Sequence, residues 1–109
     1  MTAGYDPTPF RVSVVRSGRE ARVRLTGELD VATAPELEAA LEGLIEPDPP
    51  ELVIVEAADL SFADVVGLGI LIETNERLAP EGRLRLHEPA RQIVRVLDLL
   101  DQHELIVLD

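Results

Sequence analysis

The spacing of apolar residues changes several times along this chain, and no other feature of the sequence restricts the possible folds as strongly. Apolar and polar residues alternate in "FRVSVV" (residues 10–15) and in "ARVRLTG" (residues 21–27), as in strands with one solvated face. The intervening "RSGRE" contains Ser17 and Gly18, which favour a turn. The two segments are therefore predicted to form an antiparallel hairpin.

The spacing changes to that of a helix in "TAPELEAALEGLI" (residues 33–45). Thr33 and Glu36 have the T-x-x-E pattern of a capping box, and Pro35 suits the first turn. The "EPDPP" segment after it ends the helix. The apolar residues at intervals of three and four, which are expected to face the core, are Leu37, Ala40, Leu41, Leu44 and Ile45.

Strands and helices alternate in the rest of the chain. A central strand is predicted at residues 52–55, a helix at about 65–78, a strand at 83–88, a helix at 90–100, and a strand or extended tail at 104–108. The order ββαβαβαβ predicts an α/β fold with a mixed β-sheet, in which an N-terminal antiparallel hairpin precedes parallel pairings made through right-handed crossovers.

The length of 109 residues fits one compact domain. Residues 1–9 show no periodicity and contain one glycine and two prolines, so a flexible N-terminal tail is expected there. Residues 10–109 are expected to form the single domain.

Composition narrows the possible functions. The absence of cysteine excludes a disulfide framework, a thiolate metal site and a cysteine nucleophile. The formal net charge of −11 argues against direct binding to nucleic acid, and it indicates either a basic protein partner or only a need for solubility. Neither a secretion signal nor an apolar run of about 20 residues is present, so we expect a cytoplasmic protein without membrane insertion.

The sequence predicts no catalytic residue, no metal site and no cofactor. His87 and His103 are too few for a histidine-rich site, and the acidic residues form no recognisable catalytic pattern. The "GLG" of residues 67–69 lacks the other residues of a nucleotide-binding loop. Two glycines in one helical turn instead indicate close approach of the helix to the sheet or to a partner.

Two acidic residues lie where loops lead into helices. Asp30, at the end of "GELD", is expected to form an Asx-type turn. Asp64 is expected to cap the second helix by accepting from the N–H of Val66 or Gly67. Val65 and Val66 are unusual next to such a cap, because helix starts favour small polar side chains.

The segments "TGELDVATAPEL", "LVIVEAADLSFADVVGLGIL" and "GRLRLHEPARQIVRVLDLL" resemble the STAS domain family, and within it the bacterial anti-sigma factor antagonists. The resemblance covers residues 10–108 and includes two motifs: G-E-L-D, and D-S-S-G-L, which is D-V-V-G-L here. It implies a regulatory, non-enzymatic domain that binds an anti-sigma factor or a related serine kinase-like protein. The partner-binding residues it implies are Asp30, Thr33, Asp64, Val65, Val66, Gly67 and Leu68.

In this family, the partner kinase phosphorylates the serine or threonine just before the motif's glycine. That position is Val66 here, and the adjacent serine position is Val65. Valine cannot accept a phosphoryl group, so the resemblance implies a domain that cannot be switched at this site. Ser61 and Thr33 are nearby hydroxyls outside the motif position, and Glu56 replaces an aspartate that is usual in the family.

Three functions remain open from the sequence. The first is an antagonist-like regulator whose binding does not respond to phosphorylation, with the two valines forming a dry contact. The second is an accessory or scaffold module of another system, such as a lipid-transport ABC complex or a larger signalling assembly. The third, an enzyme or small-molecule carrier, is supported only by scattered carboxylates. The valines could also pack the loop onto the core as a hydrophobic staple, and the oligomeric state stays open.

Overall fold

The computed structural model describes residues 9–107. Each predicted helix and strand has a counterpart in it, although several boundaries differ. In chain order the elements are β1 (Arg11–Ser17), β2 (Glu20–Leu29), α1 (Ala34–Ile45), β3 (Leu52–Ala63), α2 (Val65–Leu78), β4 (Arg83–His87), α3 (Arg91–Leu99), the 3-10 helix η1 (His103–Leu105) and β5 (Ile106–Val107).

The strands form one mixed sheet in the order β1-β2-β3-β4-β5. β1 and β2 are antiparallel, and every other neighbouring pair is parallel. Ser17 pairs with Glu20 across the hairpin turn, where Gly18 has a φ of +62°, a value that glycine adopts without strain. The predicted hairpin and the predicted mixed sheet are both confirmed.

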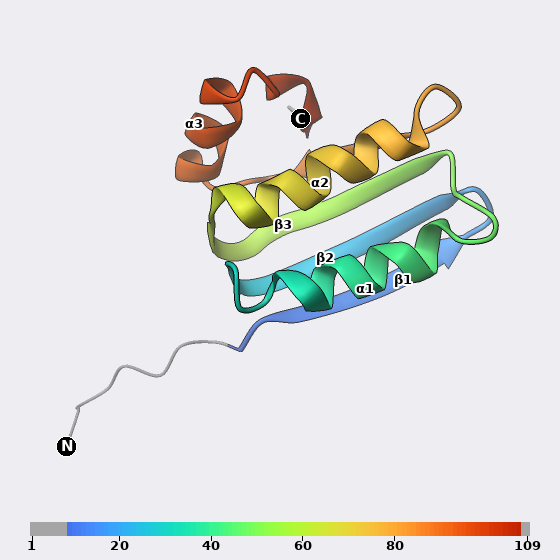
Figure 1. Cartoon of the computed structure of the whole chain (residues 1–109), viewed down its shortest axis with the longest axis horizontal. Coiled ribbons are helices and arrows are strands. Elements are labelled where there is room, and N and C mark those ends of the chain that lie inside the picture. The colour runs from blue at the N-terminus through green and yellow to red at the C-terminus, as the bar shows by residue number, and fades with distance from the viewer. Residues whose placement is uncertain (1–8, 108–109) are drawn as a thin grey trace.

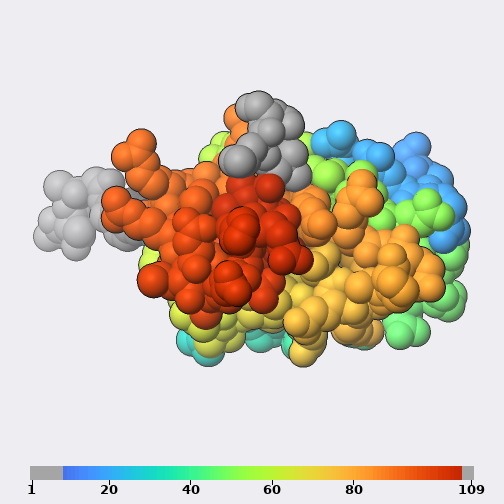
Figure 2. Space-filling view, turned by 90° about the horizontal axis from the view of Figure 1, so that it is seen from above, coloured from blue at the N-terminus to red at the C-terminus, as the bar shows by residue number. Residues whose placement is uncertain are grey.

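Helices cover one face of the sheet. Figure 1 shows α1 and α2 side by side in front of the strands, and Figure 2 shows α3 and the residues after it beside α2. In β2 the buried Ala21, Val23 and Leu25 alternate with the exposed Arg22 and Arg24. The opposite face of β2 is therefore left to solvent.

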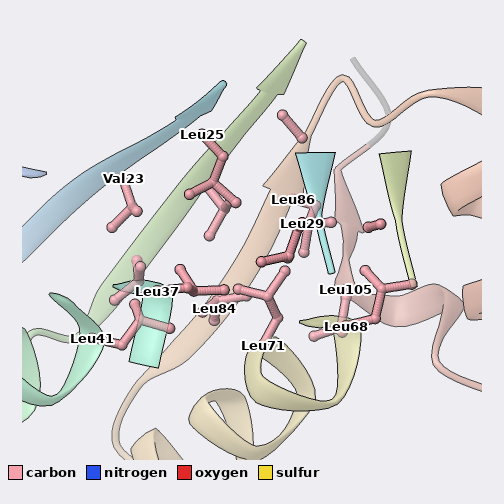
Figure 3. Close-up of a cluster of buried hydrophobic side chains, with 14 of the residues drawn as sticks. Val23, Leu25, Leu29, Leu37, Leu41, Leu68, Leu71, Leu84, Leu86 and Leu105 are labelled. Atoms are coloured by element: carbon pink, nitrogen blue, oxygen red, sulfur yellow. The ribbon is translucent and has the colours of Figure 1, made fainter. Parts of the chain in front are cut away.

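The core between sheet and helices is aliphatic. Figure 3 shows leucines of β2, β4, α1 and α2 converging on it, and the predicted inner face of α1 is confirmed except that Ala40 is only half-buried. Removing these side chains from water is the main stabilising contribution available to a domain of this size. Fully buried large residues are Leu25, Leu29, Leu37, Leu41, Leu60, Leu68, Leu71, Leu84, Leu86, Ile93, Leu97 and Leu105.

β3 is much longer than predicted, because it continues beyond Val55 to Ala63. Its pairing with β2 shifts twice, between Arg24 and Thr26 and again between Gly27 and Glu28 of β2. Each shift adds one residue to β3, as in a β-bulge. The bulges interrupt the alternation of buried and exposed residues, and for this reason the sequence did not show a strand there.

The chain ends agree with prediction only in part. β5 covers two of the five residues predicted as a C-terminal strand or tail; residues 103–105 form η1, and Leu108 lies outside the described residues. Of the predicted tail, residues 1–8 also lie outside this range, and the single domain stays a prediction. No helix within residues 9–107 is both long enough and apolar enough to cross a membrane.

Candidate partner-binding site

Two loop-to-helix junctions meet at the carboxyl ends of β2 and β3. These strands are parallel, and Leu29 pairs with Ala63 at their ends. The backbone N–H of Asp64 also donates to the carbonyl oxygen of Leu29, at 3.0 Å. The junctions that carry Asp30 and Asp64 therefore form one end of the molecule, at the left of Figure 1.

The first junction is held by a compact set of hydrogen bonds. Asp30 Oδ1 accepts from the N–H groups of Ala32 and Thr33, at 2.9 and 3.1 Å, which confirms the Asx-type turn. The Thr33 hydroxyl accepts from the Asp30 N–H at 2.9 Å and donates to the Glu28 carbonyl oxygen at 2.9 Å. Both side chains are thus engaged in fixing the loop.

The predicted capping box is wrong. Thr33 does occupy the N-cap position of α1, but its side chain caps no helical N–H. The hydroxyl has turned back to the loop, where it satisfies Asp30 and Glu28 instead. Glu36 lies in the first turn of α1, where its negative charge suits the positive end of the helix dipole.

The second junction caps α2 as predicted. Asp64 Oδ1 accepts from the N–H of Gly67 at 2.9 Å. This bond satisfies one of the free N–H groups of the first turn, and it places a carboxylate at the positive end of the helix dipole. The first turn of α2 is therefore fixed in position.

The five residues of the D-V-V-G-L motif differ sharply in exposure. Leu68 is fully buried, and Gly67 is buried so closely against Leu29 that a β-carbon would overlap that side chain. Val65 and Val66 are 60% and 51% exposed. Gly67 and Leu68 therefore support the site from within, whereas the valines are available to a partner. Their exposure also contradicts the alternative in which they pack onto the core.

Two exposed apolar residues at this end were missed. Val31, in the first loop, is 69% exposed, and Phe62, near the end of β3, is 42% exposed. The position of Val31 directly after Asp30 could have indicated it from the sequence. Phe62 lies between the predicted strand at 52–55 and the predicted helix at about 65–78, where the sequence predicts no element. We call Asp30, Val31, Thr33, Phe62, Asp64, Val65 and Val66 together the carboxyl-end surface.

The sequence segment that contains this surface carries only acidic charged residues. Residues 25–76 contain no lysine, arginine or histidine, although they make up nearly half of the sequence. Six of the acidic residues form ion pairs with arginines outside the segment: Asp48 and Glu51 with Arg19, Glu56 with Arg22, Asp59 with Arg24, and Glu42 and Glu46 with Arg77. Opposite charges increase the rate at which partners meet and favour the correct partner. The acidic residues in this segment are Glu28, Asp30, Glu36, Glu38, Glu42, Glu46, Asp48, Glu51, Glu56, Asp59, Asp64, Glu73 and Glu76.

The other residues considered from the sequence lie elsewhere. Glu56 lies on the solvent-facing side of the sheet, where its carboxylate contacts His87 Nδ1 at 2.6 Å and Arg22 Nη1 at 2.7 Å. The hydrogen bond with His87, assisted by Arg22, holds the pKa of Glu56 below its ordinary range although partial burial opposes this. His103 is exposed in η1. Within residues 9–107, no three His, Asp or Glu side chains are grouped so that they could hold a metal ion.

Comparison with known proteins identifies the family. The family model described as "Mlab, STAS domain" matches residues 12–108. The chain belongs to the STAS domain family.

Relatives of this STAS domain include anti-sigma factor antagonists. The anti-sigma-B factor antagonist of Bacillus subtilis (strain 168) is 27% identical over 98 residues, which are 89% of this chain and 88% of the relative. An anti-sigma factor antagonist from Mycobacterium paratuberculosis has a TM-score of 0.76 at 24% identity, over 93% of this chain and 87% of that one. The unphosphorylated antagonist SpoIIAA has a TM-score of 0.74 at 22% identity, over 91% and 86% of the two chains.

The same protein from Bacillus is also known in its phosphorylated form, with a TM-score of 0.73 at 23% identity, over 91% of this chain and 89% of that one. These structures confirm the STAS fold. The assignment of Val66 to the family's phosphorylated position stays a prediction.

Proposed function

We propose that this STAS domain is a non-enzymatic regulator whose carboxyl-end surface binds an anti-sigma factor or a related serine kinase-like protein in the cytoplasm. The observation that carries the proposal is the pair of exposed valines on the first turn of α2, held in place by the Asp64 cap. Exposed apolar side chains gathered in one region mark interaction surfaces. The name of the Bacillus subtilis relative supports the class of partner.

The proposed partner has an apolar contact area with basic residues around it. The apolar anchors on this side are Val31, Phe62, Val65 and Val66. Asp30 directly precedes Val31 in sequence, and Asp64 directly precedes Val65. Burial of the valines in such a contact has no desolvation cost, because their side chains carry no polar group. The acidic residues around them favour arginine or lysine on the partner.

Binding is proposed to be independent of phosphorylation at position 66. A phosphate would add about −1.5 to −2 charges and would disrupt an apolar contact. Val66 cannot carry one, and the nearest hydroxyls are already hydrogen-bonded within the chain: Ser61 Oγ donates to the Gly27 carbonyl oxygen at 3.1 Å, and Thr33 bridges Asp30 and Glu28. Control would then depend on the amount of protein or on another ligand.

Calorimetric titration with the purified cognate anti-sigma factor tests the proposal. The parent should bind with micromolar or tighter affinity, and Val66→Asp should weaken binding at least about tenfold, a loss of about 1.4 kcal/mol. Leu99→Asp is the matched control, because Leu99 is an 85% exposed apolar residue at the end of α3. Absence of a complex with the parent, or equal loss in both variants, would contradict the proposal.

Phosphorylation by the partner is a separate test of the missing acceptor. Val66→Ser should be phosphorylated when the partner is a kinase and ATP is supplied, whereas the parent should not. The phosphorylated variant should leave the complex, and the unphosphorylated variant should stay. Phosphate on the parent at any residue of the carboxyl-end surface would refute independence from phosphorylation.

A second candidate is an accessory or scaffold module of another system, such as a lipid-transport ABC complex. The matching family model supports this second candidate, because its description names a STAS domain without reference to sigma factors. The same carboxyl-end surface would then bind an ATPase or a sensor subunit. Recovery of transporter subunits with the parent from its native host, lost in Val66→Asp, would select this candidate over the first.

A further inference from the structure

The outer edge of β1 is the long open edge of the sheet. β1 is the first strand in the sheet order and, within residues 9–107, it pairs only with β2. Its seven residues keep an unbroken register from Arg11 to Ser17, whereas β5 at the opposite edge has two residues. The outer N–H and C=O groups of such a strand can pair with another strand.

β1 has few of the features that usually protect an edge, since its only charged residues are Arg11 at its first position and Arg16. It contains no proline, no acidic residue and no bulge. Arg16 is a charged residue on the helix-covered side, but its guanidinium group is bound to other residues of its own chain. Its Nη1 donates to the Asp48 carbonyl oxygen at 2.6 Å, and its Nε donates to the Gly18 carbonyl oxygen at 2.9 Å.

Apolar surface lies at the centre of this edge. Val14, on the helix-covered side, is 40% exposed, and Val15, on the other side, is 68% exposed. A groove of about 390 Å³ between β1 and α1 adjoins Val14, and a β-carbon added to Gly43 in this groove would contact nothing within 4 Å. The groove thus has room for side chains from an added strand. Its other lining residues are the small or apolar Ala40, Leu44 and Pro47 and the charged Arg16, Glu46 and Asp48.

We propose that β1 pairs with β1 of a second copy of this chain, antiparallel and with Val14 opposite Val14. This is the antiparallel register that pairs all seven residues. It places Arg11 opposite Ser17, Val12 opposite Arg16, and Ser13 opposite Val15. No arginine opposes another arginine, so the like-charge repulsion that destabilises cross-strand pairs is absent. A register displaced by one residue could not form the ladder, because residues whose N–H and C=O groups point outward would then lie opposite residues whose groups point back to β2.

Such a dimer would join two sheets into one and leave the carboxyl-end surface free in both copies. That surface lies at the ends of β2 and β3, whereas the contact is made along the side of β1. In the proposed register, residues opposite each other point to the same side, so both α1 helices lie on one face of the joined sheet. The inference is independent of the proposed function.

Disulfide trapping tests the register directly, because the chain has no natural cysteine. Opposite residues in an antiparallel pair have Cα atoms about 4.5–5.5 Å apart, within disulfide range. Val14→Cys should therefore form a covalent dimer under mild oxidation. Val15→Cys is the matched control: its two cysteines would be displaced by two residues, about 8 Å apart and out of range. Because Val15 is more exposed than Val14, random collision would favour the control. Equal or faster crosslinking of Val15→Cys would overturn the proposal.

Sedimentation velocity gives a second test that needs no crosslink. The parent should show a dimer whose population rises with concentration. Val14→Lys, which places two lysines opposite each other, should weaken the dimer at least about tenfold. Val15→Lys, which faces Ser13, should change it less, and circular dichroism should show both variants folded. A parent that stays monomeric at all concentrations, or equal weakening in both variants, would refute the pairing.

Discussion

Gly67 at the start of α2 lies directly against Leu29 at the end of β2, so closely that a β-carbon at position 67 would overlap the leucine side chain. This contact sets how near α2 can approach the sheet. It explains one of the two glycines in the first turns of α2. Gly69 has no such contact, since an added β-carbon there would meet nothing within 4 Å.

Gly67→Ala should reduce the free energy of unfolding by about 1–3 kcal/mol, because the added methyl group must displace Leu29 or the helix. Gly69→Ala should raise it by up to about 1 kcal/mol, since alanine is the better helix former and the space is open. Urea denaturation of both variants checks the pair. A stabilising Gly67→Ala would show that the contact is not restrictive.

Asp64→Ala should lower the free energy of unfolding by about 1 kcal/mol through loss of the bond to the Gly67 N–H. Asp64→Asn should keep most of the stabilisation by the cap, because the amide oxygen can still accept the hydrogen bond. It should lose only the interaction of the charge with the helix dipole. Chemical denaturation measures both. An asparagine variant as unstable as the alanine variant would show that charge, not the cap, is the stabilising element.

Thr33→Val should loosen the first loop, because its hydroxyl joins the Asp30 N–H to the Glu28 carbonyl oxygen. The expected loss is about 1 kcal/mol of stability, together with faster hydrogen exchange at the Asp30 amide. Thr33→Ser keeps the hydroxyl and should keep the protection of that amide. If the Asp30 amide exchanged at the same rate in Thr33→Val and in the parent, the hydroxyl bridge between Asp30 and Glu28 would be contradicted.

Glu56 should make stability depend on acid pH. Its pKa in the folded state lies below the ordinary value of 4.5, chiefly because of the hydrogen bond with His87. The stabilisation is therefore fully present above that ordinary value and is lost as pH falls through the lower pKa of the folded state. Glu56→Gln should flatten this acid-side loss in denaturation midpoints measured over a pH series.

Glu76→Gln is the control for this pH series. Glu76 is exposed on α2 and takes part in no ion pair among the residues the structure describes. Its substitution should leave the shape of the acid-side curve unchanged. If both variants show the same curve as the parent, the Glu56–His87 interaction contributes nothing measurable.

Much of the fold could be predicted because it depends on local periodicity. The hairpin and the inner face of α1 follow from spacing alone, since an alternating or helical pattern determines which side is buried. The extension of β3 to Ala63 could not be predicted in this way. Its two bulges break the alternation, and bulges depend on pairing with β2 rather than on the sequence of β3.

The site shows the same division between local and tertiary effects. The Asp64 cap was predictable because donor and acceptor are three residues apart. The role of Thr33 was not predictable. Its hydroxyl could bond either to the first turn of α1 or to the preceding loop, and the conformation of the folded loop favours the bonds to Asp30 and Glu28. Phe62 was missed because it lies in the extension of β3 beyond the two bulges, where the sequence shows no alternating pattern.

The hydrogen bond from the Asp64 N–H to the Leu29 carbonyl oxygen ties the second junction to the strand that leads into the first. A partner that contacted both junctions would therefore meet two loops already fixed relative to each other. Ordering loose loops on binding has an entropic cost, and a preorganised surface avoids most of it. Association at this end of the molecule should accordingly proceed in a single kinetic phase, with no slow rearrangement after encounter.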